Sequence, residues 1–281
     1  MMTIEALRAL KTCCIGLTSL ATAMLMTTMP AQAAGDLLVA PTRVVLDGDR
    51  GTEVILNNIG SETATYRISL ELRRMTADGR LEEVTADQAN EIEQAAKAMI
   101  RYAPRRVTLP PNQPQAIRLG VRAPEGLPDG EYRVHLLFRA IPETRSVTDQ
   151  TVPDGGFTIA LTPIYGVTIP IIVRYGNLQA TAAIANGRME KDADGQSFAF
   201  DLSRSGDRST YGEIRITKPG IDEPVMIARG IAVYPEVTKR TVSLPVPPEI
   251  AAQLNGQISV AYYESANDGG ALIAKTDMVI R

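Results

Sequence analysis

Few residues of this 281-residue chain could carry catalysis. His135 is its one histidine. The run around it alternates like a strand, so His135 should point to the face opposite that of Val134 and Leu136. A position on that face favours an ordinary, partly exposed side chain over a general base. Neither a nucleophile elbow nor a nucleotide-binding loop is present in the sequence. The sequence therefore predicts no enzyme and no cofactor.

An acidic cluster is the nearest approach to a metal site. Glu190, Asp192 and Asp194 precede a glycine, but the downstream ligands of a calcium loop are missing, which favours a turn between two strands. The only two cysteines, Cys13 and Cys14, lie near the N-terminus. With one histidine and no later cysteine, a zinc site of the usual kinds cannot be built. We expect no metal.

The N-terminus has the pattern of a secretory signal peptide. Arg8 and Lys11 precede an apolar run that begins at Cys13, and Ala31 to Ala33 form an A-x-A cleavage site. We expect residues 1–33 to be removed near Ala33 and the protein to be periplasmic. No later segment is apolar enough to insert into a membrane. The formal net charge of −3 gives no basic excess for nucleic acid.

The apolar stretches that follow are short, β-rich and bounded by glycine, proline, asparagine or aspartate. This spacing predicts an all-β chain of two sandwich domains, each of roughly 100 to 140 residues. We place the domains at residues 34–175 and 176–281. The one predicted helix runs from Ala86 to Ile100, with Thr85 and Gln88 as its capping box, as a short insert in the first domain.

One stretch, GFTIALTPIYGVTIPIIVRYG, looks like an unusually long edge strand. Every second residue from Phe157 to Val173 is apolar or aromatic, and its two prolines favour an edge. A continuous strand of this length would span roughly 55 Å, against about 20 Å for a typical strand. Either all of it is core with a bulge, or the chain breaks between Pro163 and Gly166 and the first half presents its side chains to a partner.

Several motifs resemble those of the PapD-like periplasmic pilus chaperones of the chaperone-usher pathway. They cover most of the first predicted domain, whereas the second resembles the family mainly in length and strand pattern. The matching stretches, in chain order, are TRVVLDG from Thr42, a strand ending at Asn58, LPPNQPQAIRL from Leu109, LPDGEYRVHLLFRAIP from Leu127, and IIVRYG from Ile171.

The resemblance implies two immunoglobulin-like sandwiches arranged as a boomerang. It also implies that the last strand of the first domain is lent to a pilus subunit whose own sandwich lacks one, with alternate side chains filling the subunit's groove. Those side chains would be Phe157, Ile159 and Leu161. Arg43 takes the place of an arginine that binds the subunit's terminal carboxylate, a task suited to a guanidinium.

Two further positions follow from the resemblance. Arg174 and Glu131 match partners in an ion pair near the junction of the domains. Pro170 stands where the family has a second anchoring lysine, so carboxylate capture rests on Arg43 alone or needs another group. This departure, with the longer strand, indicates a divergent branch.

The sequence thus predicts a chaperone that stabilises a secreted pilus or fimbrial subunit and delivers it to an outer-membrane usher, with self-association through the donor strand as a further property. The alternative is a two-domain structural or adhesive subunit of a surface fibre. A fibre subunit is expected to have an extended N-terminal donor arm, and only a few residues lie between Ala33 and the first strand.

Overall fold

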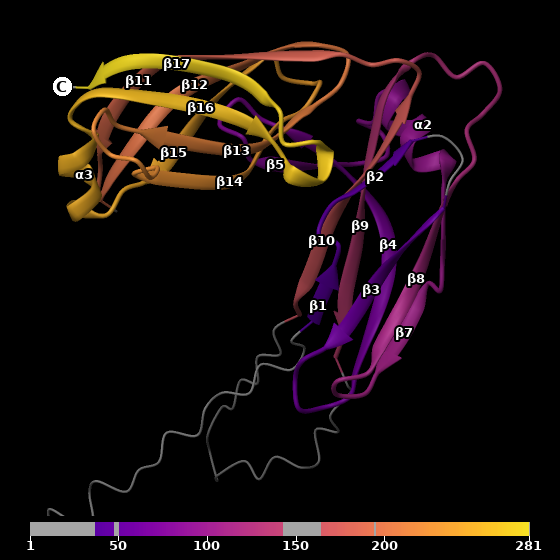
Figure 1. Cartoon of the computed structure of the whole chain (residues 1–281). Coiled ribbons are helices and arrows are strands. Elements are labelled where there is room, and N and C mark those ends of the chain that lie inside the picture. The colour runs from indigo at the N-terminus through magenta and orange to yellow at the C-terminus, as the bar shows by residue number, and fades with distance from the viewer. Residues whose placement is uncertain (1–36, 48–50, 143–163, 194, 281) are drawn as a thin grey trace, which may run out of the picture. The chain divides into compact units, whose positions relative to one another are not determined.

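The computed structural model describes residues 37–47, 51–142, 164–193 and 195–280. The predicted signal peptide and its cleavage site lie outside these ranges. The described chain is rich in β-strands, and strands β1 to β10 form sheets separate from those of strands β11 to β17 (Figure 1). Within the described ranges, no helix is long and apolar enough to cross a membrane.

Two sheets make the first sandwich. One has the strand order β1-β3-β8-β6, and the other has the order β2-β10-β9-β4-β5, with β7 also paired to β4. Every pairing is antiparallel except that of β2 with β10. The strands are β1 Leu37–Ala40, β2 Val44–Asp47, β3 Thr52–Asn58, β4 Ala64–Met75, β5 Leu81–Val84, β6 Ile100–Ala103, β7 Arg106–Leu109, β8 Pro114–Val121, β9 Gly130–Ile141 and β10 Gly166–Tyr175.

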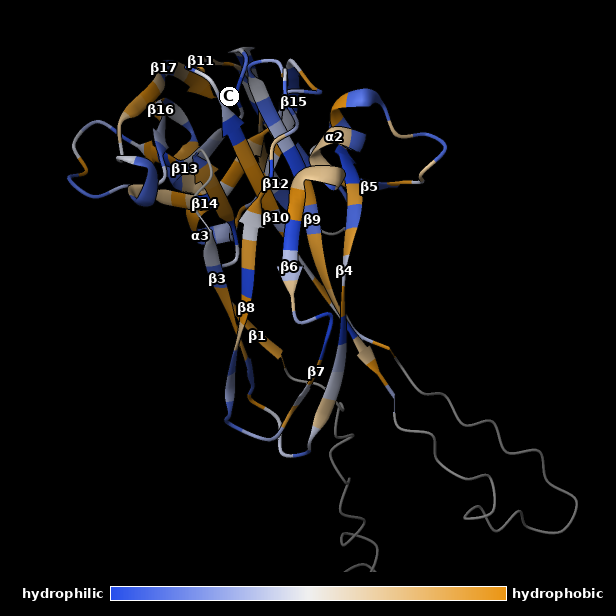
Figure 2. Ribbon diagram, turned by 90° about the vertical axis from the view of Figure 1, so that its right-hand side faces the viewer, coloured by the Kyte–Doolittle hydropathy of each residue, from blue (hydrophilic) through white to orange (hydrophobic). Residues whose placement is uncertain are grey.

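Alternation along the strands builds the core of this sandwich. Val134, Leu136 and Ile171 from one sheet pack in a single buried cluster with Leu56 and Ile117 from the other. Figure 2 shows the corresponding change between hydrophobic and hydrophilic residues along strands such as β4 and β8. Because side chains of a strand point alternately to its two faces, such a pattern directs one set of side chains into this core. The opposite face of the β10 sheet is left for other contacts.

The predicted helical insert is present but begins later than expected. Helix α2 runs over Glu91–Met99, and Asn90 caps it in a box with Glu93. Thr85 and Gln88 form a turn ahead of the helix instead, with Gln88 N–H bonded to Thr85 O at 3.1 Å.

The second sandwich pairs a three-stranded sheet, β11-β12-β15, with a four-stranded sheet, β14-β13-β16-β17. One buried cluster joins them, including Phe198 and Phe200 of β12 and Ile214 and Tyr262 of the facing sheet. A short helix, α3, was not predicted. The elements are β11 Ala180–Lys191, β12 Gln196–Gly206, β13 Thr210–Thr217, β14 Met226–Val233, β15 Lys239–Pro245, α3 Pro248–Leu254, β16 Gly256–Glu264, η3 Ala266–Asp268 and β17 Leu272–Ile280.

The all-β prediction of two sandwiches with a short helix in the first is confirmed. Gly176 stands between the two sets of sheets. Its φ of 89° is left-handed, and a Cβ there would run into the side chain of Asp129, so this position requires glycine. The predicted domain bounds, 34–175 and 176–281, stay a prediction.

Candidate functional site at the free edge of β10

Half of strand β10 has a strand on one side only. It pairs with β9 along its whole length, whereas β2 flanks it only from Ile171 to Arg174. Among the described residues, the stretch from Gly166 to Pro170 therefore has a free edge (Figure 1). The prediction of an edge strand holds for this stretch, but it is wrong for Ile171 to Arg174, where the parallel strand β2 forms the edge.

The free edge carries backbone groups that can bind a further strand. Ala140 N–H donates to Tyr165 O at 2.9 Å, which makes this opposed pair a hydrogen-bonded one. Since hydrogen-bonded and non-bonded pairs alternate in an antiparallel ladder, the backbone groups of Gly166, Thr168 and Pro170 point away from β9. Pro170 lacks an N–H, but its nitrogen faces the free side, so the β9 ladder loses nothing. This explains how a proline is tolerated inside the strand.

The side chains of β10 divide between core and outer face. Ile169, Ile171 and Val173 are buried in the first core, as expected for the half of the run assigned to this sandwich. On the other face, the Thr168 hydroxyl donates to Glu71 Oε1 at 2.9 Å. Phe157, Ile159 and Leu161, the side chains predicted to fill a client's groove, lie outside the described residues, and their role stays a prediction.

Arg43 stands where the free edge ends. It directly precedes β2, and extending the β2–β10 register by one residue places it beside Pro170. Its Nη1 lies 3.4 Å from Asp268 Oδ2, and its guanidinium carbon lies 4.3 Å from the ring centre of Tyr211. The side chain is only 9% exposed.

Two of the three guanidinium nitrogens of Arg43 make no hydrogen bond to the part of the chain that the structure describes. Nε and Nη2 are buried and have no hydrogen-bond partner among the described residues. These two N–H groups lie on one edge of the guanidinium and can hold both oxygens of a carboxylate. Leaving buried donors unpaired is costly, so a carboxylate that reached this edge would find two donors available to bind it.

Asp268 and Tyr211 were missed by the sequence analysis. Both belong to the second sandwich, Asp268 to η3 and Tyr211 to β13. Gly269 and Gly270, both with positive φ, follow Asp268. This glycine pair is the one local signal that could have marked Asp268 as held in a tight turn.

Arg174 and Glu131 face each other across the β9–β10 pair. Arg174 Nε lies 3.3 Å from Glu131 Oε2, and the Glu131 side chain is fully buried. The same Oε2 accepts hydrogen bonds from Ser209 of the second sandwich, from its N–H at 3.0 Å and its hydroxyl at 2.8 Å. Glu131 thus contacts both sandwiches, while its importance for their junction stays a prediction.

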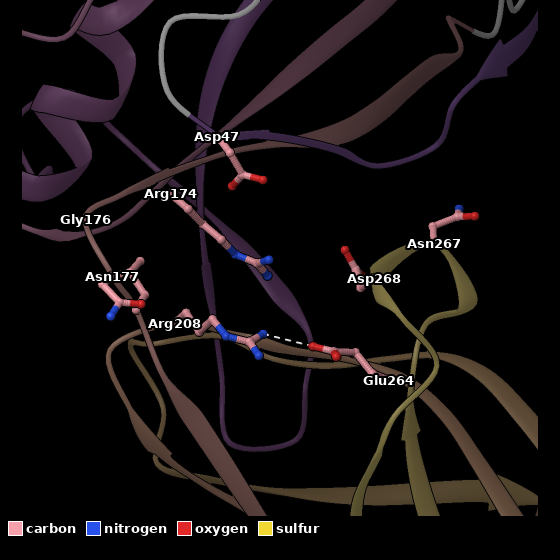
Figure 3. A pocket seen from close by; sticks show the side chains of 9 residues that line it. Asp47, Arg174, Gly176, Asn177, Arg208, Glu264, Asn267 and Asp268 are labelled. Carbon is pink, nitrogen blue, oxygen red and sulfur yellow. Dashed lines mark hydrogen bonds and ion pairs between the residues drawn. The ribbon is translucent and has the colours of Figure 1, made fainter.

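Beside this pair lies a polar pocket of about 460 Å³. Figure 3 shows Arg174 and Asp47 on one side of it, Asp268 on the other, and Arg208 joined to Glu264. No group of histidine, cysteine, aspartate and glutamate side chains in the described part of the chain is placed to hold a metal ion. Charges of both signs line the pocket, and among its described lining residues Arg208 and Glu264 form an ion pair, 3.0 Å apart.

A second set of contacts between the sandwiches surrounds Tyr234. Arg133 lies over the Tyr234 ring, 3.6 Å from its centre, and also binds Glu236. Ile172 of β10 packs in a small buried cluster with Tyr234. The outer face of β10 is therefore covered beyond Pro170 by the second sandwich.

His135 is buried, so the prediction of a partly exposed side chain is wrong. It does point away from the core, but it is 1% exposed because neighbouring groups cover this face. Burial, with the nearby Arg133 and Arg73, lowers the pKa of His135 to about 3. The ring is therefore neutral near pH 7, and such a weak base is poorly matched to general-base catalysis at that pH.

Comparison with known proteins gives distant matches only. No family model and no curated protein matches the sequence. Chains in three solved structures are similar: the Salmonella enterica SafA pilin in complex with the SafB chaperone (16% identity, 87% of this chain and 96% of that one, TM-score 0.45), the E. coli chaperone DraB (13%, 88% and 97%, 0.45), and the CsuC-CsuE chaperone-tip adhesion subunit pre-assembly complex of Acinetobacter baumannii (13%, 87% and 97%, 0.43). At such a distance a likeness does not identify a function.

Proposed function

We propose that this protein is a periplasmic chaperone that binds a secreted pilus or fimbrial subunit by lending it a strand. The lent segment is Phe157 to Leu161 together with the free edge of β10, and Arg43 binds the subunit's terminal carboxylate. The observation that carries the proposal is the meeting, at one point, of a free strand edge with a buried guanidinium edge whose two donors bind no described residue. The sequence motifs shared with pilus chaperones support the same conclusion.

In this proposal the added strand has one direction. Its last residue must reach Arg43, beside Pro170, while the rest lies along Gly166 to Thr168. A chain that runs in this way is parallel to β10 and continues the line of β2, which pairs with β10 in parallel. Backbone hydrogen bonds would then supply affinity that is independent of the client's sequence, and alternate side chains would supply specificity.

Apolar side chains contribute the larger part of the binding energy in this proposal. Phe157, Ile159 and Leu161 would each stabilise the complex by about 1.5 to 3 kcal/mol if fully buried in the client's groove. The carboxylate on Arg43 sets the register, because only one alignment of the client strand places its last residue at that guanidinium edge. Pro170 provides no charge, so the site depends on one arginine.

Delivery to an outer-membrane usher completes the proposed role, which includes no catalytic step. Export follows from the signal peptide predicted for residues 1–33. Until a client binds, the free edge can pair with another copy of the chain, which accounts for the proposed self-association.

Co-purification from the periplasm tests the proposal. We expect the tagged wild-type protein to retain a secreted β-rich subunit, identified by mass spectrometry, and Arg43→Ala to lose it. The variant should stay folded under the conditions of the assay, because Val44 and Leu46 hold β2 in the core. Arg118→Ala, which removes an exposed arginine of the same sandwich, is the matched control.

Two outcomes would contradict the proposal. One is an Arg43→Ala protein that retains its subunit at the wild-type level. The other is a purified wild-type protein that assembles into long fibres through its own strand, since this would favour the structural fibre subunit instead.

A further inference from the structure

We propose that Asp268 regulates the carboxylate site by competing for the charge of Arg43, an inference that rests on the proposed function. Asp268 lies on the second sandwich, 3.4 Å from Arg43 Nη1. Asp268 contacts the guanidinium at Nη1, whereas Nε and Nη2 bind no described residue. The client's last carboxylate would therefore be the second anion on a single cation.

Two carboxylates on one guanidinium weaken each other. The attraction of each to Arg43 is partly offset by their mutual repulsion, and the site is largely shielded from water because Arg43 is 9% and Asp268 19% exposed. An incoming client thus binds less tightly than it would to an unpaired arginine. Such weakening suits a carrier that must release its client.

Burial of the Nε and Nη2 edge of Arg43 also weakens client binding. Nε and Nη2 are buried, so a client carboxylate can enter only when the cover over Arg43 opens. Asp268 and the ring of Tyr211 are parts of that cover. Breaking the contact with Asp268 both opens the site and frees the charge of Arg43.

The effect must be reciprocal. If the contact between Arg43 and Asp268 weakens client binding, then a bound client weakens that contact by the same factor. Because the contact joins the two sandwiches, capture of a client at β10 is coupled to the second sandwich. Asp268 is therefore a tuning residue rather than an additional anchor for the client.

The charge of Asp268 can be removed with little change of shape. In Asp268→Asn the amide oxygen can accept from Arg43 Nη1 only as a weaker, uncharged partner, so the cover over the guanidinium opens more often. Asp277→Asn is the matched control, because it removes one negative charge from an exposed position on β17. Asp268→Ser is a second uncharged variant, used if the first fails to fold.

The experiment measures two quantities on these variants. One is the affinity for a synthetic peptide of alternating apolar residues with a free terminal carboxylate, compared with its amide. The other needs no client: the rate at which phenylglyoxal modifies Arg43, followed by mass spectrometry. For Asp268→Asn we expect about tenfold tighter carboxylate binding, equal to about 1.4 kcal/mol, unchanged amide binding and several-fold faster modification. Asp277→Asn should match the wild type in both.

The two readouts separate the inference from the proposed function. Faster modification of Arg43, without a preference of any variant for the carboxylate over the amide, would reject the proposed function but keep the control of Arg43 by Asp268. An unchanged modification rate overturns the inference whatever the peptide does. Carboxylate binding that is equal or weaker in Asp268→Asn also overturns it, because a purely structural contact would have that effect.

Discussion

Removing the Arg174 charge should destabilise the protein far more than removing a similar arginine at the surface. Arg174 lies 3.3 Å from Glu131, which is fully buried, while Arg174 itself is 16% exposed. At an effective dielectric constant of about 20, charges at this distance interact by about 5 kcal/mol. Part of that is offset by desolvation, so for Arg174→Met we expect a loss of about 3 kcal/mol in the free energy of unfolding.

Arg118 provides the comparison, since it lies 3.4 Å from Glu53 with side chains that are 84% and 51% exposed. Arg118→Met should therefore cost less than about 1 kcal/mol in urea unfolding. Adding Glu131→Gln to Arg174→Met should restore stability, because it removes the uncompensated charge and keeps an acceptor for Ser209. A cost below about 1 kcal/mol for Arg174→Met, or no restoration in the double variant, would refute this reasoning.

Two further predictions concern other parts of the first sandwich. The pKa of His135 is about 3 in the folded protein and near 6.5 in the unfolded chain. Between these pH values only the unfolded chain binds a proton at His135, so the free energy of unfolding falls as the pH is lowered from 6.5 toward 3. The fall is up to about 1.4 kcal/mol per pH unit. His135→Leu should flatten the fall of the unfolding free energy below pH 6.5, and parallel pH curves for the two proteins would contradict this. Asn90→Ala removes the cap of α2 and should cost about 1 kcal/mol in urea unfolding, whereas Asn90→Asp should cost little; equal effects would argue against capping.

Local patterns predicted the strands and the free half of β10 because side-chain alternation and proline chemistry act over a few residues. They could not predict that β2 covers the second half of β10, since this pairing is decided by the path of the chain between the two sheets. The sequence did not predict the burial of His135 for a related reason. The alternation of side chains along β9 identified the face on which His135 lies, but not the groups that cover that face.

The start of the helix shows how tertiary contacts decide between equivalent local signals. Both Thr85 with Gln88 and Asn90 with Glu93 have capping-box spacing. The structure uses the second, in which Glu93 also binds Arg74 at 2.8 Å. Helix α3 was missed because it is too short to show a helical period.

Within the candidate site, the resemblance to pilus chaperones identified Arg43 but not the residues that hold it. Asp268, in η3, lies more than two hundred positions further along the chain, and Tyr211 comes from strand β13 of the second sandwich. No periodicity or spacing connects such positions. Only the folded chain shows that one of the guanidinium's nitrogens contacts Asp268 while the other two bind no described residue.

The central claim is that the two halves of the run from Phe157 to Val173 serve different molecules. The most direct test compares client pull-down and thermal melting for Ile159→Asp and Ile171→Asp. Ile171 is fully buried in the first core, so its replacement should unfold the protein. Ile159→Asp should melt near the wild-type temperature and bind no client, because an unpaired carboxylate in an apolar groove costs several kcal/mol. Equal destabilisation by the two changes, or normal client binding by Ile159→Asp, would contradict the account.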